Sequence, residues 1–469
     1  MNRTIKDISE NGPFKYFEHH IKYLKILNKW ASFKAISDVP TLNDAILKIK
    51  KGERSFYYKA NNLTTPKHID PVAFQNIGYG FKKPFNLVNE KFEFYVPEGV
   101  NIHNIAFSEK IDHFGNINNL NTKNFSVGEK YYRAIIPIKY EEHNDITIFF
   151  KTESLKVDDW SKPIGLLILD KYDIFEYSFE GINYIVIDAT KTISFEKFYD
   201  QLFKIIYCFA FISGNLYRDE LNLFSSTDKT FREIDGFAFK EVAPSIIENL
   251  TVIPYRFIRS IKRLKDFDET RITSYSFNMI VNKTISEPEL LRCIKLLTEA
   301  ANLSLELRTS IYSVCLETIR NIIQEKNQEK LFPFKNKPDC RSFIDASKEI
   351  LAGIPDASFN NRDAVKKRIE NINQLGNTES FTSVFKLLGI ELNKDDIECI
   401  NRRNDFLHGR IPFEDIDELR YVADKLFQLV EYLILKYCEY SGVVLNQANL
   451  TLAMKNMPLE KDKFLLRKI

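Results

Sequence analysis

The amino-acid sequence predicts an α+β protein, in which a helical and β-rich N-terminal region is followed by an all-α helical bundle. Short apolar runs separated by Asn, Gly, Pro and Asp dominate from about residue 56 to 190, as in antiparallel sheets. From Glu287 onward, nearly every segment follows the spacing of amphipathic helices. With 469 residues, 44% of them hydrophobic and 28% charged, the chain can form more than one globular core.

These patterns divide the chain into three predicted regions. Residues 1–190 are expected to form an N-terminal helix and an antiparallel β domain with a sensor or regulatory role. Residues 191–284 are expected to be a mixed, mainly helical connection, and residues 285–469 the helical bundle. The residue pattern changes between the β-rich and helical parts, which indicates that each part has its own core.

Within the N-terminal region, the first 55 residues carry mixed charges around apolar positions and are predicted to be helical. Further along, Phe94 and Val96 alternate with more polar neighbours, as in a half-buried strand. Glu180 and Gly181 separate two apolar runs and predict a tight hairpin turn. Strands are predicted at residues 92–96, 134–138, 146–150, 166–169, 174–179 and 182–187.

Two helices stand out after the β-rich region. Ser194 is placed to cap a helix that continues through Ile212 and is closed by Gly214. A flexible loop is predicted at residues 225–230. The clearest helix lies near residues 414–440, where apolar residues step by three and four: Ile416, Leu419, Ala423, Leu426, Val430, Leu433 and Tyr437. This spacing is typical of a core seam in a bundle or of a helix–helix interface.

The segment from residue 393 to 410 holds the residues that suit chemistry. Asn393 is placed to cap a helix, and Gly409 and Pro412 are placed to end it. Asn404 and His408 are four residues apart on one face, and Arg403 lies about 140° around the helix from His408. Because arginine has a long side chain, we expect the guanidinium, the carboxamide and the imidazole to converge at the last helical turn.

Those three side chains suit metal-independent cleavage of RNA through its own 2′-OH. Histidine can transfer protons near neutral pH, and His408 is the only histidine after His143. Arg403 would stabilise the charged phosphate, and Asn404 would orient the imidazole or hold a phosphate oxygen. From spacing alone, a structural role is favoured: Asn404 and His408 would bond neighbouring helices, and Arg403 would form a surface ion pair.

The motif from Arg403 and Asn404 to His408 and Gly409 resembles the signature of the HEPN superfamily, with four residues between the arginine and the histidine. Residues 303–324, with Arg308 and Glu317, resemble the long second helix of the ApeA-like anti-phage branch. The resemblance covers roughly residues 285–445 and, more weakly, the β-rich front. It implies a homodimer with a composite RNA-cutting cleft, a cyclic phosphate product and a role in bacterial defence through abortive infection.

Further basic residues are candidates for binding RNA. Arg402 and Arg410 flank the motif and could contact phosphates, as could Lys366, Lys367 and Arg368. For the second group, a solvated helix face is the alternative interpretation. The net charge of +2 predicts that any RNA site is a local patch and not a strongly basic domain.

Several other classes of protein are not predicted. The six cysteines are scattered without metal-ligand spacing, so neither disulfides nor a zinc site is expected, and no cofactor or metal is predicted. The first residues lack the apolar core of a signal peptide, and the longest apolar run, residues 205–212, is too short to span a membrane. We therefore expect a cytoplasmic protein without membrane contact.

Two rival functions remain open at this point. The helical bundle could be a non-catalytic HEPN module that binds nucleic acid or nucleotide and scaffolds a complex. Alternatively, the β domain could be the functional part, sensing a phage-derived trigger such as a protein or a sugar, while the bundle only dimerises. If the motif is catalytic, we expect His408→Ala and Arg403→Ala to abolish cleavage and leave folding near wild type.

Overall fold

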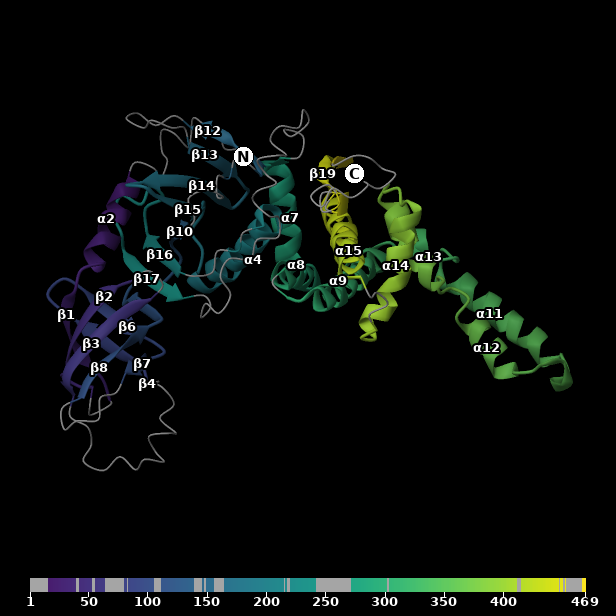
Figure 1. Cartoon of the computed structure of the whole chain (residues 1–469), viewed down its shortest axis with the longest axis horizontal. Coiled ribbons are helices and arrows are strands. Elements are labelled where there is room, and N and C mark those ends of the chain that lie inside the picture. The colour runs from purple at the N-terminus through teal and green to yellow at the C-terminus, as the bar shows by residue number, and fades with distance from the viewer. Residues whose placement is uncertain are drawn as a thin grey trace, which may run out of the picture. The chain divides into compact units, whose positions relative to one another are not determined.

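The computed structural model shows a mixed α+β protein whose C-terminal part is helical (Figure 1). The described residues within Met1–Arg259 and Arg271–Asn278 form one compact unit, and those within Met279–Ile469 form a second. No helix within the described ranges is long and apolar enough to cross a membrane. The structure describes residues 16–38, 42–52, 55–63, 80–81, 83–104, 111–138, 146, 149–155, 164–214, 216, 220–241, 271–301, 303–410, 415–446, 448–449, 452 and 466–469.

The first unit is organised by one large sheet, which has sixteen strands among the described residues. All of its strand pairs are antiparallel. In order across the sheet, the strands are β12 (Glu153–Leu155), β13 (Ile164–Ile168), β14 (Tyr172–Phe179), β15 (Ile182–Ala189), β10 (Tyr131–Ile138), β16 (Glu220–Ser226), β17 (Gly236–Glu241), β9 (Asn119–Thr122), β6 (Glu93–Val96), β5 (Phe85–Val88), β1 (Ala31–Ile36), β2 (Ile46–Lys51), β3 (Phe56–Leu63), β8 (Ile111–Ile117), β7 (Val100–Asn104) and β4 (Gly80–Phe81). A separate parallel pair joins β11 (Phe150–Lys151) and β18 (Ile272–Thr273).

The predicted hairpin is confirmed. Strands β14 and β15 pair through the whole of their length, and the turn between them consists of Glu180 and Gly181, with φ of 49° and 80°. Two consecutive residues with positive φ form the turn that matches the right-handed twist of the flanking strands. The predicted strands at residues 134–138 and 166–169 correspond to β10 and β13. Of the strand expected at 146–150, only Phe150 lies in a described strand.

The helical prediction for residues 1–55 is wrong beyond residue 28. Helix α2 covers Phe17–Leu27, but residues 31–36 and 46–51 form β1 and β2. In both strands, buried apolar residues alternate with exposed residues, which is the period-two pattern of a sheet with one buried face. Most of the exposed residues are polar, but Ile36 and Ile46 are exposed as well. The lysines on the exposed face gave these segments a helix-like composition. Residues 1–15 lie outside the described ranges.

Helix α4 (Phe195–Ser213) agrees with its predicted caps. The Ser194 hydroxyl accepts a hydrogen bond from the Lys197 backbone N–H, and Gly214 ends the helix with a φ of 72°. The next segment differs from expectation, because residues 220–226 form the buried strand β16 and residues 236–241 form β17. The stretch expected as a mainly helical connection therefore contributes two strands to the sheet. The loop predicted at residues 225–230 begins only after Ser226.

The second unit is a helical bundle with a short hairpin. Helix α9 lies at its centre and packs against α8, α14, α15 and α13. Strands β19 (Val443–Leu445) and β20 (Leu466–Lys468) pair antiparallel beside the helices. The helices are α7 (Ser274–Ser286), whose first residues belong to the other unit, α8 (Pro288–Ala300), α9 (Leu305–Lys326), α10 (Gln328–Leu331), α11 (Lys337–Ala352), α12 (Arg362–Glu370), α13 (Asn377–Leu387), α14 (Lys394–Leu407) and α15 (Ile416–Tyr437), with a 3₁₀ turn at Asp356–Ser358.

Helix α15 carries the predicted apolar seam. Six of its seven seam residues are buried, while Ile416 at the first position is exposed. Each large apolar side chain removed from water in this way contributes about 1.5–3 kcal/mol, so the seam is a main source of stability for the bundle. The buried seam residues are Leu419, Ala423, Leu426, Val430, Leu433 and Tyr437.

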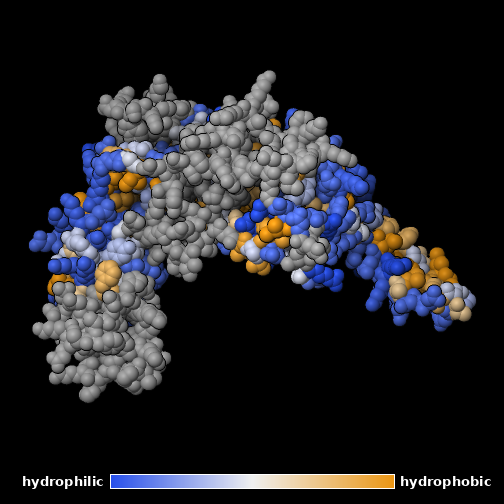
Figure 2. Space-filling view, viewed as in Figure 1, coloured by the Kyte–Doolittle hydropathy of each residue, from blue (hydrophilic) through white to orange (hydrophobic). Residues whose placement is uncertain are grey.

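Helices α11 and α12 pack against each other and bury little apolar surface. In α11 only Cys340 and Leu351 are buried, and in α12 no residue is. Large apolar side chains remain exposed on and beside this pair, and Figure 2 shows them as hydrophobic patches at the end of the helical unit. They are Phe343, Ile350, Ile354 and Ile372.

Candidate active site at the end of helix α14

Helix α14 begins where the sequence predicts. The Asn393 side chain accepts a hydrogen bond from the Asp396 backbone N–H at 2.8 Å, and the Asp396 carboxylate accepts one from the Asn393 backbone N–H at 3.0 Å. This reciprocal capping box satisfies two backbone donors that the first helical turn would otherwise leave unpaired. Asp395 and Asp396 also place negative charge at the positive end of the helix dipole.

The same end of α14 is held by a buried ion cluster. Asp396 Oδ1 lies 2.9 Å from Lys425 Nζ of α15, and both side chains are fully buried. Asp396 Oδ2 lies 3.3 Å from Arg467 Nη1 of β20, and the Arg467 guanidinium also lies over the Tyr432 ring. Two cations therefore neutralise one carboxylate, and residues from α14, α15 and β20 are joined at a single point.

The other end of α14 is open. His408 is the C-cap residue and its side chain is exposed. Gly409 follows with a φ of 70°, a conformation that side chains with a Cβ rarely adopt, and the Arg410 backbone N–H donates to the Asp405 carbonyl at 2.8 Å. The predicted end of the helix at Gly409 is thus confirmed. Pro412, also expected to end it, lies outside the described residues.

Arg403 occupies a different environment from His408. Its side chain is 1% exposed and faces α13 and α9. Nη1 donates to the Ile400 carbonyl at 2.6 Å, and Nη2 donates to Asn377 Oδ1. Nε lies 3.6 Å from Glu317 Oε1, and the guanidinium carbon lies 3.5 Å from the centroid of the Phe381 ring. A cation–π contact and charge-assisted hydrogen bonds therefore fix the guanidinium inside the bundle.

A second arginine shares two of these partners. The Arg320 guanidinium lies 4.2 Å from the centroid of the Phe381 ring, and its Nη1 donates to Ser380 Oγ at 3.3 Å. Burial lowers the pKa of both Arg320 and Arg403, and the nearby Glu317 carboxylate acts in the opposite direction. Because arginine ordinarily titrates far above neutral pH, both groups remain cations that share one partly exposed carboxylate.

The expected convergence of the three motif residues is not seen in this arrangement. Arg403 is turned into the bundle, whereas His408 is exposed at the helix end. Asn404 is half-buried, and its carbonyl accepts a hydrogen bond from the His408 backbone N–H at 3.1 Å. The reason is that Asn377, Glu317 and Phe381 together provide the guanidinium with better partners than the solvent-exposed imidazole. The alternative prediction for Arg403, an ion pair on the surface, is also wrong, because the side chain is buried.

The predicted RNA-binding residues fall into two places. Arg402 is already engaged, since its guanidinium lies 2.6 Å from Glu398 and 3.3 Å from Glu418. Arg410 is exposed, two residues after His408. Lys366, Lys367 and Arg368 are exposed on α12, which packs against α11, and α13 lies between that pair and α14 in Figure 1. The structure therefore groups Arg410 with the motif and leaves the α12 cluster apart from it.

Sequence reasoning missed the residues that hold Arg403. Asn377 and Phe381 are the first and fifth residues of α13, and nothing in their spacing links them to a motif more than twenty residues later. Glu317 was singled out only through its resemblance to a recurring polar position. A useful signal would have been the arginine itself, because a buried guanidinium requires a carboxylate or an amide partner.

No protein-family description, curated protein or solved structure matches this chain. The HEPN resemblance therefore rests on the sequence alone, on the motif from Arg403 to Gly409 and on the pattern of residues 303–324.

Proposed function

We propose that the protein is a cytoplasmic, metal-independent endoribonuclease of the HEPN type that acts in anti-phage defence by abortive infection. The observation that carries this proposal is His408, an exposed imidazole at the open end of a helix whose other end is fixed by a buried ion cluster. A group that transfers protons must reach its substrate and must also be held in place. His408 meets both requirements.

The chemistry assigned to His408 is proton transfer. As general base it would take the proton from a ribose 2′-OH, so that the 2′ oxygen attacks the adjacent phosphorus and forms a cyclic phosphate. The bond from phosphorus to the 5′ oxygen breaks, and that oxygen takes up a proton as it leaves. Because the chain supplies only one histidine after His143, a second copy would provide the second proton-transfer group. The proposal therefore includes a homodimer with one His408 from each protomer.

Phosphate stabilisation is assigned to Arg403, and Asn404 would position the imidazole or a phosphate oxygen. Since the Arg403 guanidinium is enclosed by Asn377, Glu317 and Phe381, the proposal requires it to leave these partners when RNA or a second protomer binds. Arg410 would contribute a phosphate contact beside His408. The N-terminal unit is assigned the sensing of a phage-derived trigger.

The test compares wild type with His408→Ala in phage-challenged bacteria and as purified full-length protein. Lys394→Ala is the matched control, because Lys394 is exposed at the opposite end of the same helix. We expect the wild type and Lys394→Ala to fragment cellular RNA on challenge, and His408→Ala to lose at least about a hundredfold in cleavage rate. Cleavage should persist in EDTA, and a DNA copy of the substrate should resist because it lacks the 2′-OH.

Two outcomes would remove the proposal. If His408→Ala cleaves RNA as fast as wild type, the site assignment is wrong, and if EDTA abolishes cleavage, the mechanism is wrong. Light scattering adds a third check, because full activity in a strictly monomeric protein would contradict the composite cleft.

A second function is favoured by the burial of Arg403. Four partners fix the Arg403 side chain inside the bundle, as expected if its role is structural. A structural role suits a non-catalytic HEPN module that binds nucleic acid or scaffolds a complex. In that case the purified protein would retain single-stranded RNA in a filter-binding assay without shortening it. His408→Ala would then leave both RNA binding and phage protection unchanged.

A further inference from the structure

One face of the N-terminal sheet is polar where strands β5, β6, β9 and β17 run side by side. The pairing registers place Asn86 opposite Tyr95, Tyr95 opposite Asn121, and Asn121 opposite Ala238. Directly opposed residues of antiparallel strands project from the same face, so these four side chains form one row across the four strands. The intervening residues, such as Phe94, face the core instead.

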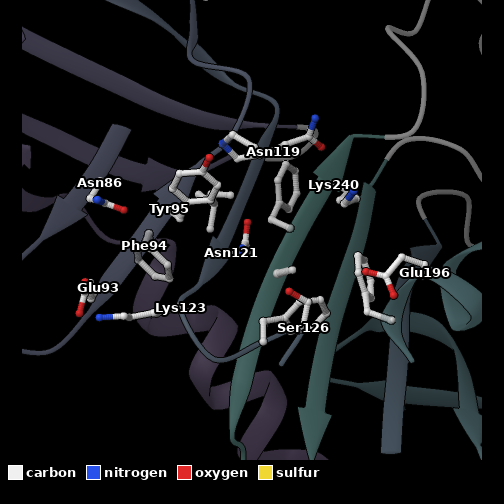
Figure 3. Close-up of a pocket in the computed structure, with 16 residues that line it drawn as sticks. Asn86, Glu93, Phe94, Tyr95, Asn119, Asn121, Lys123, Ser126, Glu196 and Lys240 are labelled. Carbon is white, nitrogen blue, oxygen red and sulfur yellow. The ribbon is translucent and has the colours of Figure 1, made fainter. Parts of the chain in front are cut away.

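A pocket of about 540 Å³ lies over this row (Figure 3). Within the row, Ala238 has a much smaller side chain than its neighbour Asn121. The start of helix α4, with Phe195 and Glu196, lines it as well. A volume of this size matches sites that take small organic ligands. The further lining residues are Glu93, Phe94, Pro97, Asn119, Leu120, Lys123, Phe125, Ser126, Phe239 and Lys240, with Asn86 at the end of the row.

Lys240 supplies an ammonium group that contacts no carboxylate of a described residue. It lies two residues after Ala238 on β17 and therefore on the same face. Its Nζ is 4.4 Å from the centroid of the Tyr199 ring and 5.4 Å from that of Phe195, and no salt bridge joins it to another described residue. Burial lowers the pKa of Lys240, although Glu98 acts in the opposite direction. A partly desolvated cation of this kind favours an anionic ligand.

Asn119 supplies a second polar group to the pocket, a buried side-chain amide. It pairs with Lys240 across β9 and β17, lines the pocket, and is 9% exposed. Within the part of the chain that the structure describes, its carboxamide makes no hydrogen bond. A carboxamide carries both donors and an acceptor, so a ligand that both donates and accepts can pair with Asn119 here. Asn121 adds a carboxamide oxygen, since only its nitrogen is engaged, by the Thr122 carbonyl at 3.3 Å.

We propose that this pocket binds a nucleoside monophosphate. The phosphate would pair with Lys240, and the carboxamides of Asn119 and Asn121 would pair with the donor and acceptor groups of the base edge. Tyr95, 39% exposed on the pocket face, offers a ring on which the base can stack. Glu93 and Glu196 can accept from ribose hydroxyls or from an exocyclic amine.

A neutral sugar fits this lining less well. It would satisfy the carboxamides and stack on Tyr95, but it would leave the Lys240 ammonium unpaired in a partly desolvated position. A polyphosphate is also disfavoured, because the carboxylates of Glu93 and Glu196 lie in the same lining. The lining thus holds two lysines, Lys123 and Lys240, and two glutamates, Glu93 and Glu196, and this balanced charge favours a ligand with a single phosphate over a polyphosphate.

The test is calorimetric titration of the full-length protein with the four ribonucleoside 5′-monophosphates. The matching nucleosides, inorganic phosphate and glucose serve as reference ligands. We expect at least one monophosphate to bind with a Kd of about 1 mM or tighter. Its nucleoside should bind about tenfold more weakly, because the Lys240 contact is lost.

Variants locate the site. Lys240→Met should weaken monophosphate binding about tenfold and make binding of the nucleoside and its phosphate nearly equal. Lys59→Met is the matched control, since Lys59 also lies beside an aromatic ring, Trp30, but outside the pocket. Asn119→Ala should weaken binding of the nucleoside and the monophosphate alike. A melting temperature within a few degrees of wild type shows that the variants are folded.

The proposal is overturned if no monophosphate binds at about 5 mM, or if glucose binds and the monophosphates do not. It is also overturned if Lys240→Met and Lys59→Met bind the monophosphate equally well. None of these outcomes bears on RNA cleavage by His408, because the titration measures binding alone and uses no RNA.

Discussion

The two ends of helix α14 differ in how tightly the rest of the bundle holds them. At the N-terminal end, a capping box and a fully buried Asp396 join α14 to α15 and to β20. At the C-terminal end, His408 and Arg410 are exposed, and the chain turns away through a glycine with positive φ. One helix thus combines a fixed base with an accessible tip.

This difference shows how a small bundle can present a reactive side chain without losing its position. A histidine in a loose loop would sample many orientations, whereas one at the tip of an anchored helix keeps its place. Arg403 lies between the two ends and resembles the anchored end, because its guanidinium is buried and held by other helices. The comparison predicts that substitutions in α14 affect stability more as they approach the buried partners.

Asp396→Ala is expected to have the largest effect. It removes the capping box and leaves Lys425 buried without its carboxylate, so the free energy of unfolding should fall by about 3–5 kcal/mol. Urea unfolding monitored by circular dichroism measures this. Asp395→Ala, in the same helical turn but outside the ion cluster, should cost less than about 1 kcal/mol. Equal losses in the two variants would show that the end of α14 is not anchored by the ion cluster.

Arg403→Ala is expected to destabilise the protein by about 2–3 kcal/mol, because it removes a cation–π contact and hydrogen bonds to a charged group. His408→Ala, five residues later, should change stability by less than about 0.5 kcal/mol. The sequence alone led us to expect that both substitutions leave folding near wild type. Thermal unfolding of the two variants side by side decides whether Arg403 belongs with the anchored part of the helix.

Glu431 on α15 makes the bundle sensitive to pH. Burial raises the pKa of Glu431 to about 8, from 4.5 in the unfolded chain. Between these values the folded state binds the proton more tightly than the unfolded state, so stability falls as pH rises from about 4.5 to about 8. Because the side chain keeps some exposed surface, we expect Glu431→Gln to stabilise the protein by about 2 kcal/mol at pH 8.5.

At pH 4.5 the Glu431→Gln variant and the wild type should unfold at nearly the same denaturant concentration, because the carboxyl is then protonated in the folded state. A gain in stability that stays constant from pH 4.5 to 8.5 would exclude titration of Glu431 as its source.

Gly409→Ala is expected to have the smallest effect and tests the open end alone. A Cβ at this position would meet no atom within 4 Å, so only the positive φ opposes it. The expected loss is about 1 kcal/mol. Gly353→Ala is the control, because Gly353 has the ordinary helical φ of −78° and should tolerate alanine without loss. A loss above about 3 kcal/mol for Gly409→Ala would mean that the open end is more constrained than described.

Local signals in the sequence predicted the elements that local interactions decide. The hairpin at Glu180 and Gly181, the caps of α4 and the limits of α14 all depend on residues within one turn of each other. Strands β1 and β2 were missed because their lysines resemble the composition of a surface helix, although β2 pairs with its sequence neighbours β1 and β3. Only β1 has a distant partner as well, β5, some fifty residues later. The amino-acid composition of a segment does not indicate such long-range strand pairing.

The candidate site shows the same division. The position of His408 at the helix end could be predicted from sequence, because a glycine readily takes the left-handed conformation that ends a helix, as Gly409 does. The orientation of Arg403 could not, since it depends on Asn377, Glu317 and Phe381, which lie on two other helices. A long side chain has several reachable positions, and only tertiary contacts select one of them.

The link from Asp396 to Arg467 has a consequence for when the protein becomes functional during its synthesis. Arg467 follows Asp396 by 71 residues, so a ribosome finishes α14 and α15 well before it supplies the cation that completes the cluster. We expect α14 on the ribosome to remain sensitive to protease until Arg467 has emerged, since domains settle as units once their contacts exist. Chains stalled at residue 467 and chains stalled after a C-terminal linker long enough to clear the ribosome would show this by limited proteolysis, and protection of α14 in the shorter chains would contradict it. If His408 acts on RNA, the RNA of the ribosome that makes the protein would be the RNA closest to it. The delay would leave helix α14 without its complete set of folded contacts while that ribosome is still translating.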